Sequence, residues 1–252
     1  MSRLFAFAYG IGCYGVMFAT LLYLFGFLAN VGVWKGIDTG AASSPGASLS
    51  IDLALLAVFG LQHSIMARPR FKAWWTRLVP QSIERSTYVL LSSAALVLLF
   101  VAWRPLTLAI WMAQASWAVT AWWAVFVSGI ALLLAATFAI DHFDLFGLRQ
   151  VWLNLRRRPP SSPHFTVAWF YQYVRHPIYL GWLLIFWATP RMTLGHLLFA
   201  GAMTIYIRVA VRHEERDLVS LHGSAYVQYR RRVPMLFPRP GQRRYTLQRE
   251  QP

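Results

Sequence analysis

Apolar residues along this chain gather into long runs that short polar stretches separate. The runs cover about residues 4–29, 51–66, 86–103, 118–140, 178–189 and 193–211. An α-helix needs about 20 apolar residues to cross a hydrocarbon core of about 30 Å, and most of these runs approach that length. The pattern therefore predicts an all-α integral membrane protein with about five to six transmembrane helices.

The last two runs are separated only by residues 190–192. At 1.5 Å per residue, the run 178–189 covers about 18 Å, which is too short to span a bilayer alone. If its helix begins earlier, near Val167, then Pro177 lies inside the helix and should kink or break it. We expect these two runs to form a C-terminal helical hairpin that enters and leaves the membrane on one side.

No low-complexity linker divides the chain into two blocks, so we expect one transmembrane domain over residues 1–238. Residues 239–252 form a basic, polar tail that we expect to be disordered. Cys13 is the single cysteine, which excludes an internal disulfide and a cysteine-based zinc site. The sequence leaves the oligomeric state open.

The net charge of +15 is distributed unevenly between the two sides of this topology. One side receives 21 of the 24 Lys and Arg residues, which predicts that both termini are cytoplasmic. We expect the membrane to be a bacterial inner membrane. This arrangement and the attraction of cations to anionic lipid headgroups explain the basic surplus without a nucleic-acid partner. Seven of the nine acidic residues fall on the same side. Chemistry is therefore expected at the cytoplasmic border.

Residues 173–182, YVRHPIYLGW, lie just ahead of an apolar run. Aromatic and basic residues at such a position are typical of the interfacial collar of a transmembrane helix. The conjunction of His176, Pro177 and Gly181 also fits a ligand site, because glycine permits close approach and a proline break frees backbone groups. Composition alone favours the collar.

The stretch 212–238, RHEERDLVSLHGSAYVQYRRRVPMLFP, follows about thirty apolar residues later. Together the two stretches give R-H-P-x-Y-x-G, a hairpin, E-E-x-x-L and Y-x-x-Y-x-x-R-x-P. This combination resembles the isoprenylcysteine carboxyl methyltransferase superfamily. The resemblance implies that about residues 165–238 form a pocket for S-adenosylmethionine that opens to the cytosol.

The resemblance assigns the cofactor site to Tyr173, Arg175, His176, Pro177, Tyr179, Gly181, Glu214, Glu215, Tyr229 and Arg232. The chemistry agrees, because a glutamate suits the ammonium of the cofactor, Arg175 or His176 suits its carboxylate, and aromatic rings suit adenine or the sulfonium. Taken alone, Glu214 and Glu215 would be read as a solvated helix end. The HEERD stretch lacks the second histidine of a zinc-binding H-E-x-x-H motif, so we expect no metal.

Two further clusters narrow the resemblance. Residues 138–153, FAIDHFDLFGLRQVWL, and 60–72, GLQHSIMARPRFK, look like the methanethiol S-methyltransferases, which make dimethyl sulfide from methanethiol and S-adenosylmethionine. From the residues alone, the first cluster equally fits a polar cap where a helix leaves the membrane. His63 in the second cluster is more often a hydrogen-bonded histidine than a catalytic one.

The reaction that this resemblance implies needs a thiolate, because small thiols are mostly protonated at neutral pH. A base should therefore contact the sulfur of a small thiol substrate. We expect His142, Asp141 and His63 as candidates, in that order, with Arg149 as an orienting cation.

Three other functions stay open. A prenylcysteine carboxyl methyltransferase would use the same cofactor site on a lipidated carboxylate. An NADPH-dependent sterol-type reductase shares a related C-terminal pattern but usually has Asn where Ile178 stands. A haem- or quinone-binding protein would use His63 and His142 as ligands.

Overall fold

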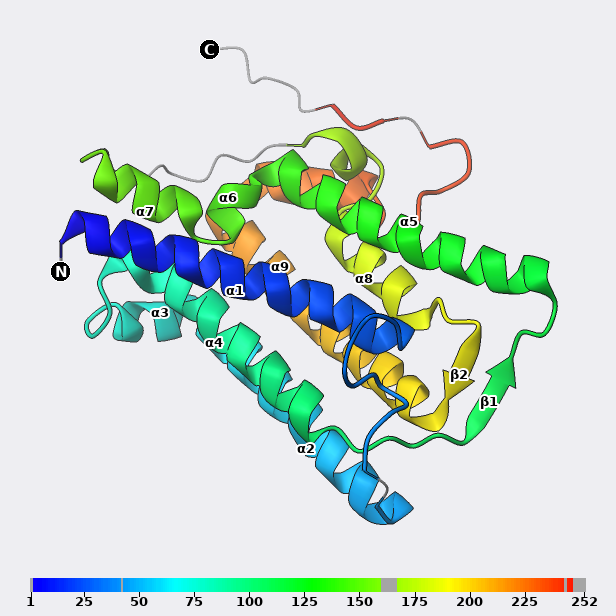
Figure 1. The fold of residues 1–252 in the computed structure, drawn as a ribbon. Coiled ribbons are helices and arrows are strands. Elements are labelled where there is room, and N and C mark those ends of the chain that lie inside the picture. The colour runs from blue at the N-terminus through cyan, green and yellow to red at the C-terminus, as the bar shows by residue number, and fades with distance from the viewer. Residues whose placement is uncertain (1, 42, 160–166, 243, 247–252) are drawn as a thin grey trace. The chain divides into compact units, whose positions relative to one another are not determined.

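The computed structural model describes residues 2–41, 43–159, 167–242 and 244–246, and these are mostly helical (Figure 1). Five helices are long and apolar enough to cross a membrane. These are α1 (Arg3–Ala29), α2 (Pro45–Met66), α4 (Gln81–Ala102), α5 (Ser116–Ile140) and α9 (Leu194–Arg232). The shorter apolar helix α8 (Pro177–Trp187) precedes α9. The prediction of an all-α membrane protein with about five to six transmembrane helices is confirmed, with five helices of sufficient length among the described residues.

Contacts divide the chain into two compact units, each assembled from three separate stretches. The first unit contains Met1–Ala113, Phe143–Ser161 and Thr189–Met203. The second contains Gln114–His142, Ser162–Ala188 and Thr204–Pro252. The region 165–238, expected to bind the cofactor, is therefore interrupted, because residues 189–203 belong to the first unit. The second unit also includes α5.

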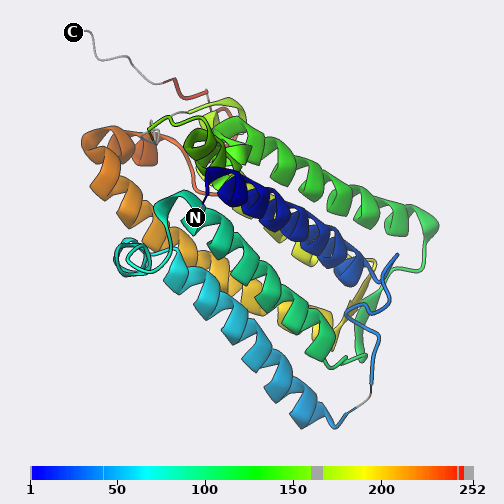
Figure 2. The same cartoon turned by 60° about the vertical axis from the view of Figure 1, so that its left-hand side comes forward.

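In the first unit, α1 packs along α4, and α4 packs along α2 (Figure 2). Ser2 caps the start of α1 by accepting a hydrogen bond from the Phe5 amide at 3.2 Å. Asn30 ends the helix in the left-handed conformation that commonly terminates helices. Local capping signals thus place both ends of the first membrane span.

The C-terminal end of α4 is closed by a buried lysine. Lys35 Nζ donates hydrogen bonds to the carbonyls of Val101 and Trp103 at 2.7 and 2.8 Å. The next amide, that of Arg104, donates to Asp52 Oδ1 at 2.8 Å. The last carbonyls of a helix have no intrahelical partners, so the ammonium satisfies groups that would otherwise be orphaned.

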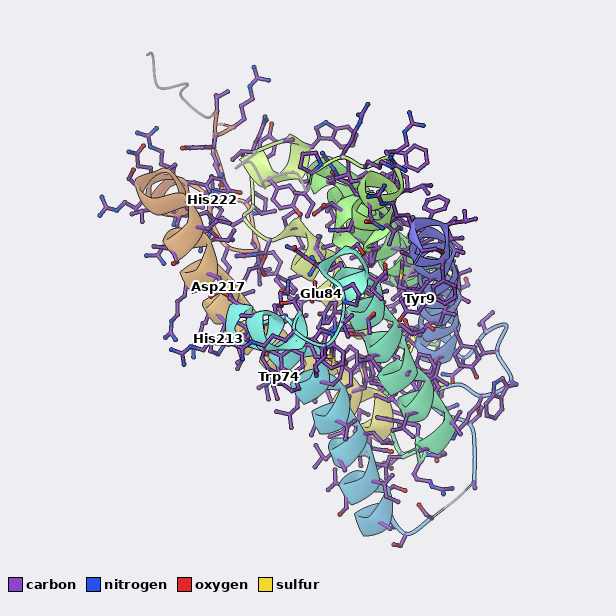
Figure 3. The ribbon with its side chains drawn as sticks, turned by 90° about the vertical axis from the view of Figure 1, so that its left-hand side faces the viewer. Tyr9, Trp74, Glu84, His213, Asp217 and His222 are labelled. Atoms are coloured by element: carbon purple, nitrogen blue, oxygen red, sulfur yellow. The ribbon has the colours of Figure 1, made fainter. Side chains whose placement is uncertain are left out.

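Several short elements had no apolar run to predict them. They are α3 (Pro69–Trp75), α6 (His142–Leu145), α7 (Leu148–Leu155), the 3₁₀ helix η1 (Trp169–Gln172) and the strands β1 (Ala109–Met112) and β2 (Arg191–Thr193). The two strands pair antiparallel. Trp74 on α3 is half-exposed (Figure 3), as expected of an interfacial element.

In the second unit, α5 packs against α8, and η1 lies beside α5. Pro177 is the first residue of α8, where a proline costs no backbone hydrogen bond. Of the two outcomes expected for a helix that begins near Val167, a kink at Pro177 is therefore wrong, and the break is what the structure has, with α8 starting at Pro177. Residues 169–172 instead form η1, a short turn with its own geometry.

The last helix is longer than its apolar run. It continues through the polar residues 212–232 and is interrupted at Gly223, whose φ of 56° lies in the left-handed region. Figure 3 shows His213, Asp217 and His222 along this extension. The tail also differs from expectation, since Tyr245 is buried and only 9% exposed. Disorder of the tail is therefore wrong at this residue.

Candidate functional site

Two adjacent glutamates on α9 have different partners. Glu214 accepts a hydrogen bond from the Tyr179 hydroxyl at 2.8 Å through Oε2. Glu215 Oε1 lies 2.7 Å from both Nε and Nη2 of Arg175. The side chain of Glu214 is 43% exposed, whereas that of Glu215 is 14% exposed. The first carboxylate therefore faces solvent, and the second belongs to an enclosed ion pair.

Arg175 joins two segments that are distant in sequence. Its Nη1 donates to the carbonyls of Arg230, at 3.0 Å, and Val233, while Nε and Nη2 contact Glu215. The side chain is only 11% exposed. The guanidinium thus holds the end of α9 against the start of α8, and its fork of donors is used within the protein.

His176 lies between the two carboxylates. Its Nε2 is 3.2 Å from Glu215 Oε1, and its Nδ1 is 4.0 Å from Glu214 Oε2. The backbone reinforces this position, because the amides of Arg175 and His176 donate to the carbonyls of Pro234 and Met235 at 2.9 and 3.1 Å. The histidine is therefore fixed through its ring and its backbone.

A group of tyrosines adjoins the ion pair. The Tyr229 hydroxyl donates to the Tyr171 carbonyl at 2.7 Å, and the rings of Tyr226 and Tyr229 lie 5.7 Å apart. Burial, aided by the charge of Glu214, raises the pKa of Tyr171, so its hydroxyl stays protonated. Tyr171 and Tyr226 were not among the predicted site residues, although Tyr226 is the first tyrosine of the Y-x-x-Y pattern.

The remaining predicted cofactor residues have varied surroundings. Tyr173 is 43% exposed, and Arg232 is exposed at the last residue of α9. Gly181 lies against α5, where an added Cβ would come within 3.0 Å of the Gly129 carbonyl oxygen and the Leu133 amide nitrogen. Helix packing alone thus accounts for the glycine at 181, and its contact with a cofactor stays a prediction.

His142 is held at the corner where α5 ends. Its Nδ1 lies 2.9 Å from Thr137 Oγ1, which itself donates to the Leu134 carbonyl at 2.7 Å. Since the threonine proton is used there, the histidine must donate from Nδ1, and the basic lone pair lies on Nε2. Burial lowers the pKa of His142, and the charge of Asp141 opposes the shift. The ring is therefore neutral near pH 7.

Asp141 carries unusual backbone geometry. Its φ of 141° and ψ of 86° lie in a region that residues with a side chain rarely adopt. Such strain persists only where the surrounding structure enforces it, and it is common at functional sites. The corner is joined to the tyrosine group, because the Tyr171 hydroxyl donates to the Ala136 carbonyl at 3.5 Å. His142 and the tyrosines thus share one unit.

His63 and Arg149 belong to the first unit. His63 Nε2 lies 2.9 Å from the Tyr88 hydroxyl, and Nδ1 lies 3.1 Å from Ser92 Oγ. Ser92 donates its own proton to the Tyr88 carbonyl at 3.0 Å. His63 therefore donates from Nδ1 and accepts from Tyr88, so both ring nitrogens are engaged. Arg149 is exposed on α7.

Comparison with known proteins identifies close relatives, although no family model and no solved structure matches the chain. A methanethiol S-methyltransferase of Crocosphaera subtropica is 49% identical over 238 residues, covering 94% of this chain and 93% of the relative. One of Mycobacterium tuberculosis is 48% identical over 240 residues, covering 95% and 98%. Methanethiol S-methyltransferase 2 of Bradyrhizobium diazoefficiens is 47% identical over 253 residues, covering 100% and 96%. With such identity over almost the whole length of each relative, this chain belongs to the methanethiol S-methyltransferase family.

Proposed function

We propose that this protein transfers a methyl group from S-adenosylmethionine to the sulfur of methanethiol and so produces dimethyl sulfide. The observation that carries the proposal is the near-complete similarity to relatives that are named for methylating methanethiol. The arrangement of carboxylates, tyrosines and a neutral histidine in the second unit supports it.

The second unit offers groups that fit S-adenosylmethionine. Glu214 is an exposed carboxylate with one hydrogen bond from Tyr179, and it suits the ammonium of the cofactor. Glu215 is less suited, because Arg175 already neutralises it. The nearby tyrosine rings suit adenine or the sulfonium, since cations and flat rings both bind well to aromatic faces.

Arg175 has a different role in this proposal from the one first expected. Its donors contact Glu215 and two backbone carbonyls, so it organises the site rather than binding the cofactor carboxylate. Tyr173 and Nδ1 of His176 are then the proposed donors to that carboxylate, because Nε2 of His176 already lies 3.2 Å from Glu215 Oε1. Arg232 is a weaker candidate, because it is exposed at the end of α9.

When bound, S-adenosylmethionine supplies an electrophilic methyl group, and its remainder would leave as S-adenosylhomocysteine. The protein must convert the thiol into a better nucleophile, because the thiolate is the reactive species. We assign this step to His142, whose Nε2 accepts the thiol proton as the sulfur attacks. Asp141 stabilises the imidazolium that results, and the proton then passes to solvent. Thr137 keeps the imidazole in the tautomer that this step requires.

His63 and Arg149 rank lower. The nitrogens of His63 are occupied by Tyr88 and Ser92, which favours a structural role within the first unit. Arg149 is retained as an orienting cation only from the motif in which it lies. We also infer that the cation-rich side faces the cytoplasm, with both termini there, since transmembrane proteins retain cationic loops on that side.

The direct test is detection of dimethyl sulfide in the headspace above the purified protein in nanodiscs. Methanethiol and S-adenosylmethionine together should give product, whereas either alone should not. Product formation with NADPH, or binding of NADPH without binding of S-adenosylmethionine, would contradict the proposal. A matched Glu214→Gln variant should retain the fold and lose most cofactor affinity.

A further inference from the structure

Three consecutive carbonyls ahead of the site accept hydrogen bonds from C-terminal groups. The Tyr171 carbonyl accepts from the Tyr229 hydroxyl at 2.7 Å. The Gln172 carbonyl accepts from the Tyr245 amide at 3.1 Å, and the Tyr173 carbonyl accepts from Gln242 Nε2 at 3.0 Å. Two of the three donors come from the tail, which the sequence indicated only as basic and polar.

The tail is also anchored by packing. We call residues 239–242 and 244–246 the C-terminal strap (red in Figure 1). The ring of Tyr245 meets that of Tyr229 edge-on, with centroids 5.3 Å apart. Gln242 closes a turn with Arg239. Its side-chain Oε1 accepts a hydrogen bond from the Arg239 backbone amide at 3.0 Å, and its backbone amide donates to the Arg239 carbonyl. Tyr245 therefore completes a buried cluster with Tyr226, Tyr229 and Val233.

The strap acts on the segment that leads into the candidate site. Residues 171–173 are followed, after Val174, by Arg175 and His176, whose amides donate hydrogen bonds to the carbonyls of Pro234 and Met235. The strap thus fixes the first half of this segment, and the end of α9 fixes the second half. A short segment held at successive backbone groups is ordered before a ligand arrives, which lowers the entropy cost of binding.

We propose that the C-terminal strap is a positioning element for the cofactor site and that Tyr245 is its principal positioning residue. The inference rests on the proposed function of that site. Tyr245 acts through Tyr229 and the Gln172 carbonyl, and it holds Tyr173 and His176 in their binding geometry. The tail thereby acts on the cofactor site indirectly, through residues 171–176.

The test compares the wild-type protein with four variants, two with a substitution at Tyr245 and two with a shortened C-terminus, all in nanodiscs. Tyr245→Ala removes the ring, Tyr245→Phe keeps it, and a chain ending after Pro238 lacks the strap. A chain ending after Thr246 keeps the strap and serves as the matched control. Binding of S-adenosylhomocysteine is measured by calorimetry, and amide hydrogen exchange is followed at residues 171–176.

Loss of the Tyr245 ring should weaken S-adenosylhomocysteine binding about threefold to tenfold, the range for one aromatic pair. The KM for S-adenosylmethionine should rise by the same factor, with kcat within about twofold of wild type. Amide exchange across residues 171–176 should accelerate, because the segment opens more often when the strap no longer holds its first half. Tyr245→Phe and the chain ending after Thr246 should match wild type in all three measurements.

The outcomes separate this inference from the proposed function. If wild type binds S-adenosylhomocysteine and the chain ending after Pro238 binds it equally well, the strap has no positioning role. If wild type does not bind it, both proposals are wrong. Should Tyr245→Ala fail to fold, Gln242→Ala replaces it, since that change removes only the bonds to Tyr173 and Arg239.

Discussion

Arg175 and Glu215 form an ion pair in which Nε and Nη2 both lie 2.7 Å from the same carboxylate oxygen. The pair joins the start of α8 to the extension of α9, and His176 adds a third contact to the same oxygen at 3.2 Å. The neighbouring Glu214 is bound by the Tyr179 hydroxyl and, among the described residues, pairs with no arginine in this way. The two glutamates therefore have different expected roles, Glu214 in cofactor binding and Glu215 in stability, and substitutions can distinguish them.

Glu214→Gln should reduce cofactor affinity with little effect on stability. The amide keeps the size of the carboxylate and can accept the Tyr179 hydrogen bond, but it loses the charge that would bind an ammonium. Because charge-assisted hydrogen bonds contribute about 1.5–3 kcal/mol, we expect S-adenosylhomocysteine binding to weaken by about tenfold or more. Calorimetry measures the affinity and thermal unfolding measures the stability. Unchanged affinity would remove Glu214 from the site.

Glu215→Gln should act mainly on stability. The substitution leaves the largely buried guanidinium of Arg175 without its counter-charge, and breaking such a pair costs about 3–5 kcal/mol. The unfolding midpoint should fall clearly, and affinity should fall with it because α8 and α9 separate. A double variant, Arg175→Met with Glu215→Leu, should recover part of the midpoint. If the single variant is as stable as wild type, the pair does not hold the two helices together.

The lowered pKa of His142 predicts how the stability of the folded protein depends on pH. Burial lowers its pKa in the folded protein below the ordinary value of about 6.5, so the folded state binds the proton less tightly than the unfolded state. The contribution of neutral His142 to stability is therefore fully present above about pH 6.5 and is lost as the pH falls through the folded pKa. Unfolding of wild type and His142→Gln, compared across pH 5–8, should converge at the acidic end.

His142 should also determine the acidic limb of the pH–rate profile. We expect kcat/KM of wild type to fall with a midpoint below about 6.5, where the imidazole becomes protonated. His142→Gln should lose this limb and should be slower by about 10²-fold at pH 7, a typical contribution of a general base. The substituted protein should still bind S-adenosylhomocysteine normally. An unaltered limb would exclude His142 as the base.

Two substitutions of Asp141 distinguish the effect of its backbone strain from the effect of its charge. Asp141→Gly relieves the unfavourable backbone geometry, worth about 1–3 kcal/mol, and removes the carboxylate. Asp141→Asn keeps the strain and removes only the charge. The glycine variant should therefore be more stable than the asparagine variant. Both should move the acidic limb of the pH–rate profile to lower pH, because the Asp141 charge raises the pKa of His142. A limb that stays in place in both variants would show that the carboxylate does not act on the imidazole.

The long helices followed from the sequence because apolar length is a local property. The spans α1, α2, α4 and α5 begin within about six residues of the predicted runs, and the differences lie at polar ends that hydropathy does not detect. The short strands β1 and β2 were missed, since their pairing joins residues about eighty positions apart. Contacts over such separations leave little trace in a local pattern.

The sequence motif indicated where the candidate site lies, but only the structure shows which of its side chains pair with one another. The sequence named Arg175, Glu214 and Glu215 together, but it could not tell which carboxylate the arginine neutralises. Adjacent residues on a helix point about 100° apart, so the choice depends on how α8 meets α9. Tyr245 was missed for a related reason. A lone aromatic residue in a basic tail gives no signal until the surface that it covers is known.

Gly181 tests whether a glycine in the motif serves packing or binding. An alanine Cβ there would lie 3.0 Å from backbone atoms of Gly129 and Leu133, which cannot move aside without separating α5 from α8. Overpacking of this kind costs about 1–3 kcal/mol, so Gly181→Ala should lower the unfolding midpoint. Gly201→Ala is the matched control, because an added Cβ at that helical position meets nothing within 4 Å, and it should be neutral or slightly stabilising. If Gly181→Ala keeps the wild-type midpoint but loses S-adenosylhomocysteine binding, the glycine exists for the cofactor and not for the helix crossing.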